Sequence, residues 1–130
     1  AGQPQIVATT IAATNITPYT PELTYSFGIQ YDHEMAGGTL SGRFDGSFQD
    51  EVFSNSENTS WSRIDGRFLG NARLSYTTAD EDWRVSLEVQ NVFDKYYFMS
   101  VSDATNNSLG VVTGVPGLPR TWALSVERRF

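Results

Sequence analysis

The ten residues TWALSVERRF, at positions 121–130, decide the fold class. Apart from Arg128, every second side chain is apolar, and the side chains between them are small or polar. A period of two residues is typical of a β-strand with one apolar and one polar face. Chain ends are ordinarily polar, so we expect lipid to cover this apolar row. The row consists of Trp122, Leu124, Val126 and Phe130.

The same alternation recurs along the rest of the chain. It is clear in four further segments and milder in an opening run, IVATTIAAT, at positions 6–14. The sequence therefore predicts an all-β fold, an antiparallel up-and-down meander of about six long strands. The four clear segments are residues 22–32, 39–49, 67–77 and 82–91.

The links between these segments alternate in length. Residues 32–38 and 77–82 form short links, whereas residues 50–66 and 98–120 form long ones that are rich in Ser, Asn, Gly or Pro. Transmembrane barrels have short periplasmic turns and longer extracellular loops. The strands are therefore predicted to be part of a transmembrane β-barrel, whose alternating strands give only a weak hydropathy signal.

Antiparallel pairing across the second short link predicts a register. Outward side chains must face outward ones, so Leu74 should lie opposite Val85 or Leu87. Arg73 should then lie opposite Ser86 or Glu88, a possible charge pair on the polar face. Arg128 alone breaks the apolar row; near a bilayer interface such a charge costs only ~0–1 kcal/mol, and its stem can snorkel.

Composition excludes several classes of protein. The 130 residues include 9 basic and 15 acidic side chains, a net charge of −6 without a basic stripe, so no nucleic-acid partner is expected. There is no cysteine, which excludes disulfides and thiolate metal sites. No cofactor is predicted. The chain opens AGQPQ, without Met, and we expect a mature or excised product.

Two stretches resemble a known family. GNARLSYTTADEDWRVSLEVQNVFDKYYF and the final GLPRTWALSVERRF are similar to the C-terminal portion of the β-barrel of a TonB-dependent outer-membrane receptor. Upstream, TPELTYSFGIQYDHEMAGGTLSGRFD resembles the preceding hairpin of that family. The positions that carry the resemblance are residues 71–76, Trp83, Val85, Leu87, Asn91, Phe93, Asp94, Lys95, Tyr97, Pro119, Arg120 and Phe130.

The resemblance implies a location, a function and partners. It implies a bacterial outer-membrane receptor, not an enzyme, for active uptake of a scarce nutrient such as a ferric siderophore, cobalamin or a glycan. The expected partners are the lipid bilayer, the remaining strands and plug of the same receptor, TonB acting through that plug, and the outer-membrane barrel assembly machinery. That machinery would read the final strand as its signal, at Trp122, Leu124, Val126 and Phe130.

Residues 1–130 would then be a C-terminal segment of the receptor barrel, and we expect neither a plug nor a TonB-contacting segment within them. Six strands would close to a barrel of roughly 12 Å diameter. That interior is too narrow for the charged side chains of the polar rows, so the segment should pair with further strands.

Aromatic residues should mark the two membrane interfaces. Trp83 and Phe130 are expected in the periplasmic girdle, and Phe93, Tyr96 and Tyr97 in the outer one. The run at positions 91–97 is interpreted as the place where the strand leaves the membrane. Asp94 and Lys95 would then lie at the level of the headgroups.

Ligand contacts are expected in the long loops, where recognition commonly resides. Trp61 could stack on a sugar, a siderophore ring or a corrinoid, or it could anchor its loop. The other candidate contacts are Asn55, Asn58, Asn106 and Asn107, with Phe53, Met99 and Asp103 nearby.

Two alternatives stay open. A small soluble β-barrel or sandwich of the lipocalin kind would keep its aromatic residues inside. An outer-membrane barrel enzyme would need a His near a Ser on one face, but His33 is expected in the solvated turn DHEMAGG, at odd spacing from Ser26. A metal site or general base at His33, beside Asp32 and Glu34, is the less favoured interpretation.

Overall fold

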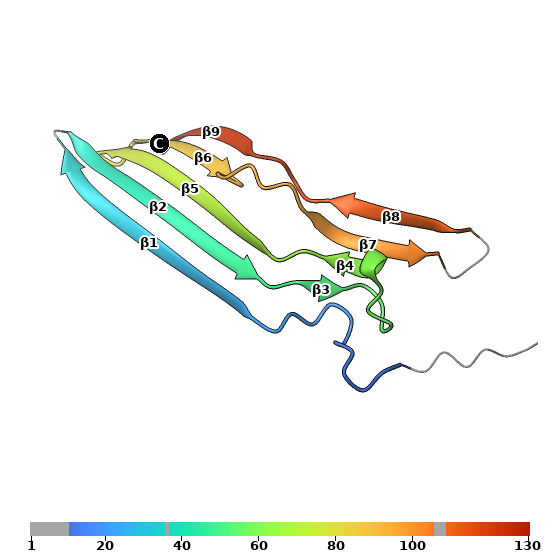
Figure 1. The fold of residues 1–130 in the computed structure, drawn as a ribbon. Coiled ribbons are helices and arrows are strands. Elements are labelled where there is room, and N and C mark those ends of the chain that lie inside the picture. The colour runs from blue at the N-terminus through green and yellow to red at the C-terminus, as the bar shows by residue number, and fades with distance from the viewer. Residues whose placement is uncertain (1–10, 36, 106–108) are drawn as a thin grey trace, which may run out of the picture.

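A five-stranded antiparallel sheet forms the body of the molecule (Figure 1). The structure is a computed structural model that describes residues 11–35, 37–105 and 109–130. The strand order is β1-β2-β5-β6-β9, so each strand of this sheet pairs with the next one along the chain. The predicted antiparallel meander is confirmed. Its strands are β1 (Thr24–Met35), β2 (Gly38–Gln49), β5 (Arg67–Thr78), β6 (Trp83–Gln90) and β9 (Thr121–Arg128).

Two smaller ribbons extend the sheet at the end opposite the short turns (Figure 1). One pairs β3 (Val52–Phe53) with β4 (Arg63–Ile64), joined through a 3-10 turn at Ser60–Ser62; the other pairs β7 (Phe98–Ala104) with β8 (Val111–Pro116). The expectation that these stretches are long loops is wrong in this respect. Strands of two residues are too short to show a period of two, and β7–β8 carries a register shift that disturbs the alternation.

The expected opening strand at positions 6–14 is not found in its described part. Residues 6–10 lie outside the described residues, and residues 11–14 adopt no strand. The backbone N–H of Asn15 instead donates to the carbonyl of Ala12 at 3.0 Å, as in a turn.

The register of the central hairpin agrees with the prediction. Leu74 pairs with Leu87, and Arg73 pairs with Glu88. The Arg73 guanidinium lies 3.4 Å from the Glu88 carboxylate. Because a slip of one residue would turn every side chain to the other face, this pairing also fixes the orientation of the neighbouring strands.

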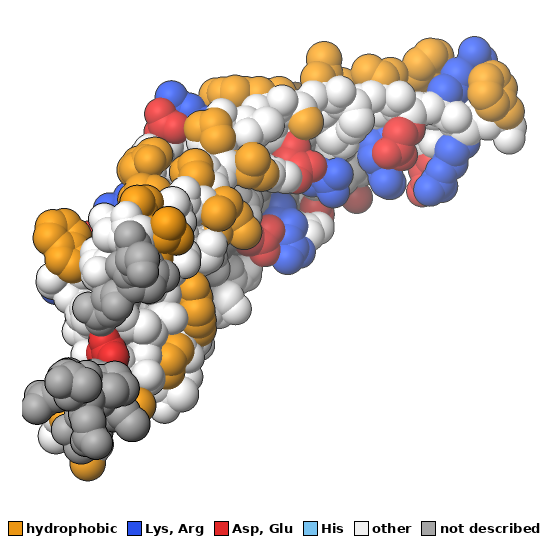
Figure 2. Space-filling view, turned by 90° about the vertical axis from the view of Figure 1, so that its right-hand side faces the viewer, with side chains coloured by type: hydrophobic (Ala, Val, Ile, Leu, Met, Phe, Trp, Pro, Cys, Tyr) orange, Lys and Arg blue, Asp and Glu red, His pale blue; other side chains and the backbone are white. Residues whose placement is uncertain are grey.

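The sheet has one apolar and one polar face. Along β9, Trp122, Leu124 and Val126 pair with Val89, Leu87 and Val85 of β6, whereas Ser125 and Glu127 pair with Ser86 and Arg84. Figure 2 shows hydrophobic side chains along one side of the slab and Arg, Asp and Glu on the opposite side. The predicted orientation of the last strand is thus confirmed.

The apolar row is exposed, which contradicts the soluble alternative. Trp122 is 62% exposed and Leu124 is 70% exposed, so these side chains lie outside any core formed by the described residues. A lipocalin-like protein would bury them. The described residues contain no helix long and apolar enough to cross a membrane.

The buried core of the described residues is small and lies within the two extensions. Val52 of β3, Ile64 of β4 and Val101 of β7 have exposed fractions of 1%, 3% and 9%. The contact between these three side chains holds the two ribbons together. The extensions therefore form one module at this end of the sheet.

Two glycines on the apolar face lie beneath aromatic rings. A Cβ added at Gly46 would lie 2.7 Å from Cζ of Phe27 and 2.8 Å from Cζ of Phe68. A Cβ at Gly70 would lie 2.8 Å from the Phe93 ring and 2.9 Å from the Phe44 ring. The four rings contact one another at centroid distances of 5.9 to 6.4 Å. The four rings therefore cover the backbone at Gly46 and Gly70, and they fill the space that a longer side chain would need there.

We expect Gly46→Ala to destabilise the assembled barrel by about 1–3 kcal/mol, because the added methyl group displaces the Phe27 and Phe68 rings. Urea unfolding of the barrel in lipid vesicles measures this. Gly42→Ala is the matched control on the same strand and face, since its Cβ would meet Leu74 Cδ1 at 3.9 Å, an ordinary contact. Equal stabilities of the two variants would contradict the proposed packing.

Candidate functional site

The polar face of the sheet carries paired charges. Arg43 donates from Nε to one Asp45 carboxylate oxygen at 2.8 Å and from Nη2 to the other at 2.7 Å. Arg43 and Arg73 lie opposite each other in the register, and Arg73 pairs with Glu88. A depression of about 400 Å³ on this face is lined by hydroxyl, guanidinium and carboxylate groups. This polar lining is chemically suited to contact water or a polar polypeptide.

A hydrogen-bonded module forms the extended end of the molecule. The Asn58 amide donates to the carbonyl of Ile16 at 2.9 Å, and its oxygen accepts from the Ile16 N–H at 2.6 Å. The Asn55 amide oxygen accepts from the hydroxyl of the fully buried Ser62 at 2.9 Å. These contacts tie the turn between β3 and β4 to the segment that precedes β1. The polar atoms of Asn55 and Asn58 are thus used to hold the module together.

Asp103 of β7 connects the second ribbon to this module. Its carboxylate accepts hydrogen bonds from the Thr59 hydroxyl and the Thr105 hydroxyl, both at 2.6 Å. The hydrogen bonds from Thr105 and Thr59 lower the pKa of Asp103 below its usual value. Asp103 therefore remains an ionised acceptor at neutral pH and fixes the two ribbons relative to each other.

Among the expected loop contacts, Trp61 lies on the surface. It belongs to the 3-10 turn and is 65% exposed, next to the buried Ser62. A rigid turn therefore presents a large aromatic ring to the outside. Asn106 and Asn107, the remaining expected contacts, lie outside the described residues.

His33 lies on a strand, contrary to the expectation of a solvated turn. Strand β1 continues to Met35 and β2 begins at Gly38, because Gly37 adopts a positive φ of 85° that allows a shorter turn. His33 pairs with Leu40 and stacks on Tyr31, with ring centroids 6.3 Å apart. It therefore faces the apolar side, whereas Ser26 faces the polar side, and the two cannot act on one substrate.

Residues 91–97 form a cluster of hydrogen bonds where β6 ends. The Asn91 amide, 5% exposed, donates to the carbonyls of Lys95 at 3.0 Å and Leu118 at 3.1 Å, and its oxygen accepts from the Lys95 N–H. Asp94 accepts from the Arg120 backbone N–H at 3.1 Å. Both Asn91 and Asp94 have positive φ values, which these residue types tolerate. These bonds connect the end of β6 to Leu118 and Arg120, which lie between β8 and β9.

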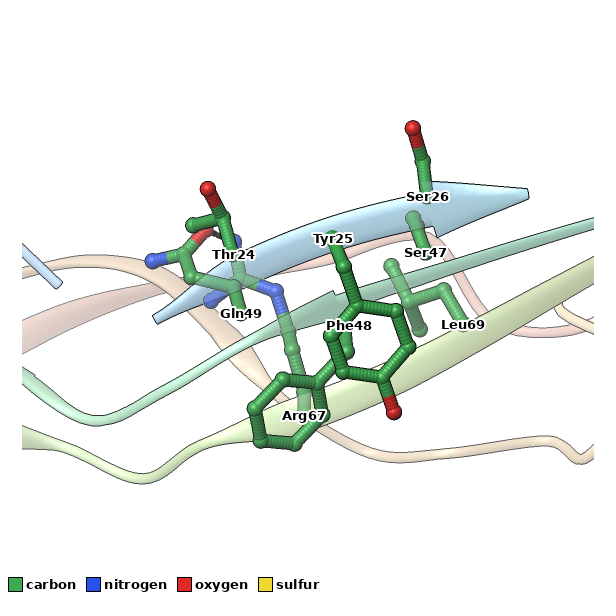
Figure 3. A pocket seen from close by; sticks show the side chains of 8 residues that line it. All are labelled: Thr24, Tyr25, Ser26, Ser47, Phe48, Gln49, Arg67 and Leu69. Carbon is green, nitrogen blue, oxygen red and sulfur yellow. Dashed lines mark hydrogen bonds between the residues drawn. The ribbon is translucent and has the colours of Figure 1, made fainter. Parts of the chain in front are cut away.

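A cavity of about 620 Å³ lies where β1, β2 and β5 reach the extended end. Figure 3 shows Thr24 and Ser26 pointing to one side of the strands and Tyr25 to the other. Most of its lining belongs to the polar face of the sheet, and Tyr25 and Phe48 belong to the apolar face. Among the described residues, β1 has one neighbouring strand, so this space borders a free sheet edge.

The expected girdle residues lie at opposite ends of the sheet. Trp83 and Phe130 lie at the end with the short turns, each with its ring beside the Arg128 guanidinium. At the other end, Phe93 contacts Phe44 and Phe68, and Tyr96 contacts Phe98 with centroids 5.4 Å apart. Tyr97 lies under the Arg67 guanidinium at 4.9 Å.

Metal-binding clusters are absent from the part of the chain that the structure describes. No group of three or more His, Asp or Glu side chains there is arranged to hold a metal ion. The described residues form a sheet with one apolar and one polar face, and the β3–β4 and β7–β8 ribbons extend it at one end.

Comparison with known proteins identifies this architecture. Residues 3–92 match the family described as TonB dependent receptor-like, beta-barrel. The chain belongs to this family. Among solved structures, it is similar to the crystal structure of BauA, the ferric preacinetobactin receptor from Acinetobacter baumannii, with a TM-score of 0.64 and 26% sequence identity. Comparison with curated protein sequences gave no match.

Membership in the TonB-dependent receptor family agrees with the two faces of the sheet and places the chain in the bacterial outer membrane. The similarity to BauA covers 86% of this chain and 16% of the BauA chain, so the chain corresponds to part of such a barrel. The family is one of receptors and not of enzymes. The predicted family, fold class and location are therefore confirmed.

We expect Asn91→Asp to destabilise the barrel by about 2–4 kcal/mol, because a carboxylate cannot donate to the Lys95 and Leu118 carbonyls. Asp keeps the size of the side chain and tolerates the positive φ, so the change acts through the two lost donated bonds and through the carboxylate charge placed beside the two carbonyl oxygens. Urea unfolding in vesicles is the measurement. Asn71→Ala, which removes one acceptor from the Asn91 N–H, should cost about 1 kcal/mol; a larger loss for Asn71→Ala would contradict a central role of Asn91.

Proposed function

We propose that the chain supplies the C-terminal strands of a receptor that actively takes up a ferric siderophore across the outer membrane. The observation that carries this proposal is the combination of family membership with the structural similarity to a ferric preacinetobactin receptor at 26% identity. Cobalamin and glycans, which receptors of this kind also take up, are the alternative cargoes.

The two faces of the sheet give each expected partner a surface. The apolar face meets the lipid bilayer, and the polar face, with Arg43, Arg73 and Glu88, faces the interior of the barrel and its plug. Energy would come from TonB acting through that plug. Further strands of the same receptor would pair along β1 and β9, each of which has one neighbouring strand among the described residues.

The extended module is the part of this chain best placed to meet a ligand outside the cell. Short turns of such barrels face the periplasm, and the longer connections face outward, so β3, β4, β7 and β8 lie on the outer side. Trp61 is the candidate contact there, because an exposed indole offers a flat surface on which the rings of an iron chelate can stack. Asn55, Asn58 and Asp103 would support it by holding the turn rigid. Asn106 and Asn107, which lie outside the described residues, remain candidate contacts.

Growth under iron limitation tests the proposal. Cells that lack the receptor should fail to grow on one or more ferric siderophores supplied as the sole iron source, and the intact receptor should restore growth. Trp61→Ala should weaken siderophore binding to the purified receptor, whereas Tyr96→Ala, on the lipid side of the outer girdle, should not. Loss of cobalamin-dependent or glycan-dependent growth instead would reject the siderophore assignment.

The final residue generates a prediction about assembly. Phe130 is fully exposed and contacts the Arg128 guanidinium, so its ring adds little buried area. Full burial of a Phe is worth ~1.5–3 kcal/mol, and deletion at the rim should cost less than this. By contrast, the unfolded chain offers the assembly machinery mainly the terminal strand with Trp122, Leu124, Val126 and Phe130, whose free edge can be captured by strand addition.

Deleting Phe130 should therefore lower the amount of receptor in the outer membrane strongly and leave the thermal stability of assembled molecules nearly unchanged. Immunoblots of outer-membrane fractions and heat-modifiable gel mobility measure the two quantities. Deletion of Leu109, at the other end of the molecule, is a control for loss of one apolar residue. Equal abundance with and without Phe130 would show that the terminal ring only packs.

A further inference from the structure

The last two arginines of the chain have different surroundings. The Arg129 guanidinium lies 3.7 Å from the Glu81 carboxylate, and its backbone N–H donates to the Asp82 carbonyl. Arg128 lies on the apolar face opposite Trp83. Its guanidinium carbon is 5.0 Å from the centre of the Trp83 ring and 4.9 Å from that of Phe130. Within the described residues, Arg128 has aromatic neighbours, and no carboxylate forms an ion pair with it.

Aromatic contacts engage the faces of a guanidinium and leave its edge available. The five N–H donors lie in the plane of the group, so stacking on Trp83 and Phe130 does not satisfy them. The nearby acidic turn has other partners: Asp80 accepts from the Thr78 hydroxyl at 2.5 Å, and Glu81 pairs with Arg129. The Arg128 guanidinium is thus oriented by Trp83 and Phe130, and its N–H groups can still donate to another acceptor.

Location determines which acceptor meets these donors. Arg128 lies on the apolar face at the short-turn end, and such turns face the periplasm in outer-membrane barrels. At that level the bilayer presents the phosphodiester groups of its inner leaflet. A guanidinium forms parallel hydrogen bonds with two phosphate oxygens, which a point charge such as Lys does less well. We propose that Arg128, held between Trp83 and Phe130, binds the phosphate of a phospholipid headgroup.

The purified receptor that contains this chain, in dodecyl maltoside, provides the test. Phosphatidylglycerol is added stepwise, and native mass spectrometry counts the lipids that remain bound. Arg128→Gln should weaken the tightest lipid binding about fivefold, the change that corresponds to ~1 kcal/mol for one basic residue near an anionic surface. Arg129→Gln is the matched control and should leave lipid binding unchanged, because its partner is Glu81.

Three further arms make the assignment specific. Dioleoylglycerol, which lacks the phosphate, should bind equally weakly to the wild type and to Arg128→Gln. Inorganic phosphate should not compete with phosphatidylglycerol; competition at similar concentrations would overturn the headgroup assignment in favour of a free-anion site. Trp83→Leu keeps the charge but removes one ring, and should also weaken lipid binding.

The Trp83→Leu variant keeps the proposal open to refutation if Arg128→Gln fails to assemble. Unchanged phosphatidylglycerol binding in either assembled variant would overturn the proposal. An equal loss in Arg129→Gln would also overturn it, because the effect would then follow net charge and not the ring-held guanidinium.

Discussion

The structure depends on the requirement that a strand in a bilayer satisfy its backbone hydrogen bonds from neighbouring strands, because lipid offers no partners. Twelve residues of β1 pair with twelve of β2, and β2 pairs with β5 over its whole length. Since side chains alternate strictly along such ladders, a single register assigns every residue to one face. The apolar and polar faces are therefore consequences of one pairing pattern. Among the described residues, β1 and β9 each have one neighbouring strand.

The apolar face shows how this pattern accommodates side chains of different size. Bulky rings cannot all lie side by side on adjacent strands. Gly46 and Gly70, which pair with each other across β2 and β5, are covered by Phe27, Phe44, Phe68 and Phe93. Aromatic cover of a glycine protects its backbone without adding a Cβ, and cross-strand ring contacts contribute to pairing. The rings gather at the extended end of the sheet, whereas Trp83 and Phe130 mark the other end.

Much of this architecture was predictable because the decisive signals are local. The period of two predicted the long strands. Parity limited the partner of Leu74 to Val85 or Leu87 and that of Arg73 to Ser86 or Glu88, and the structure has Leu87 and Glu88. The short ribbons were missed because β3 and β4 have two residues each and are held by Val101, a contact that is distant in sequence. The predicted position of His33 was wrong because the polar residues beside it, Asp32 and Glu34, suggested a longer turn. The hydrogen bonds of Asn91 depend on its positive φ and on the carbonyl of Leu118, which is distant in sequence. No pattern within one segment reveals them.

Charges on the polar face support the same orientation. Arg43 and Arg73 face each other directly, and like charges at opposed positions destabilise a sheet. Each therefore has its own carboxylate, Asp45 on the same strand and Glu88 on the next. All four side chains are substantially exposed, so water screens what repulsion remains and keeps the energy of each exposed pair small. In lipid the same arrangement would leave unpaired hydrogen-bond donors of both arginines without partners. The paired charges therefore support the proposal that this face lines a wet interior and that the opposite face meets the membrane.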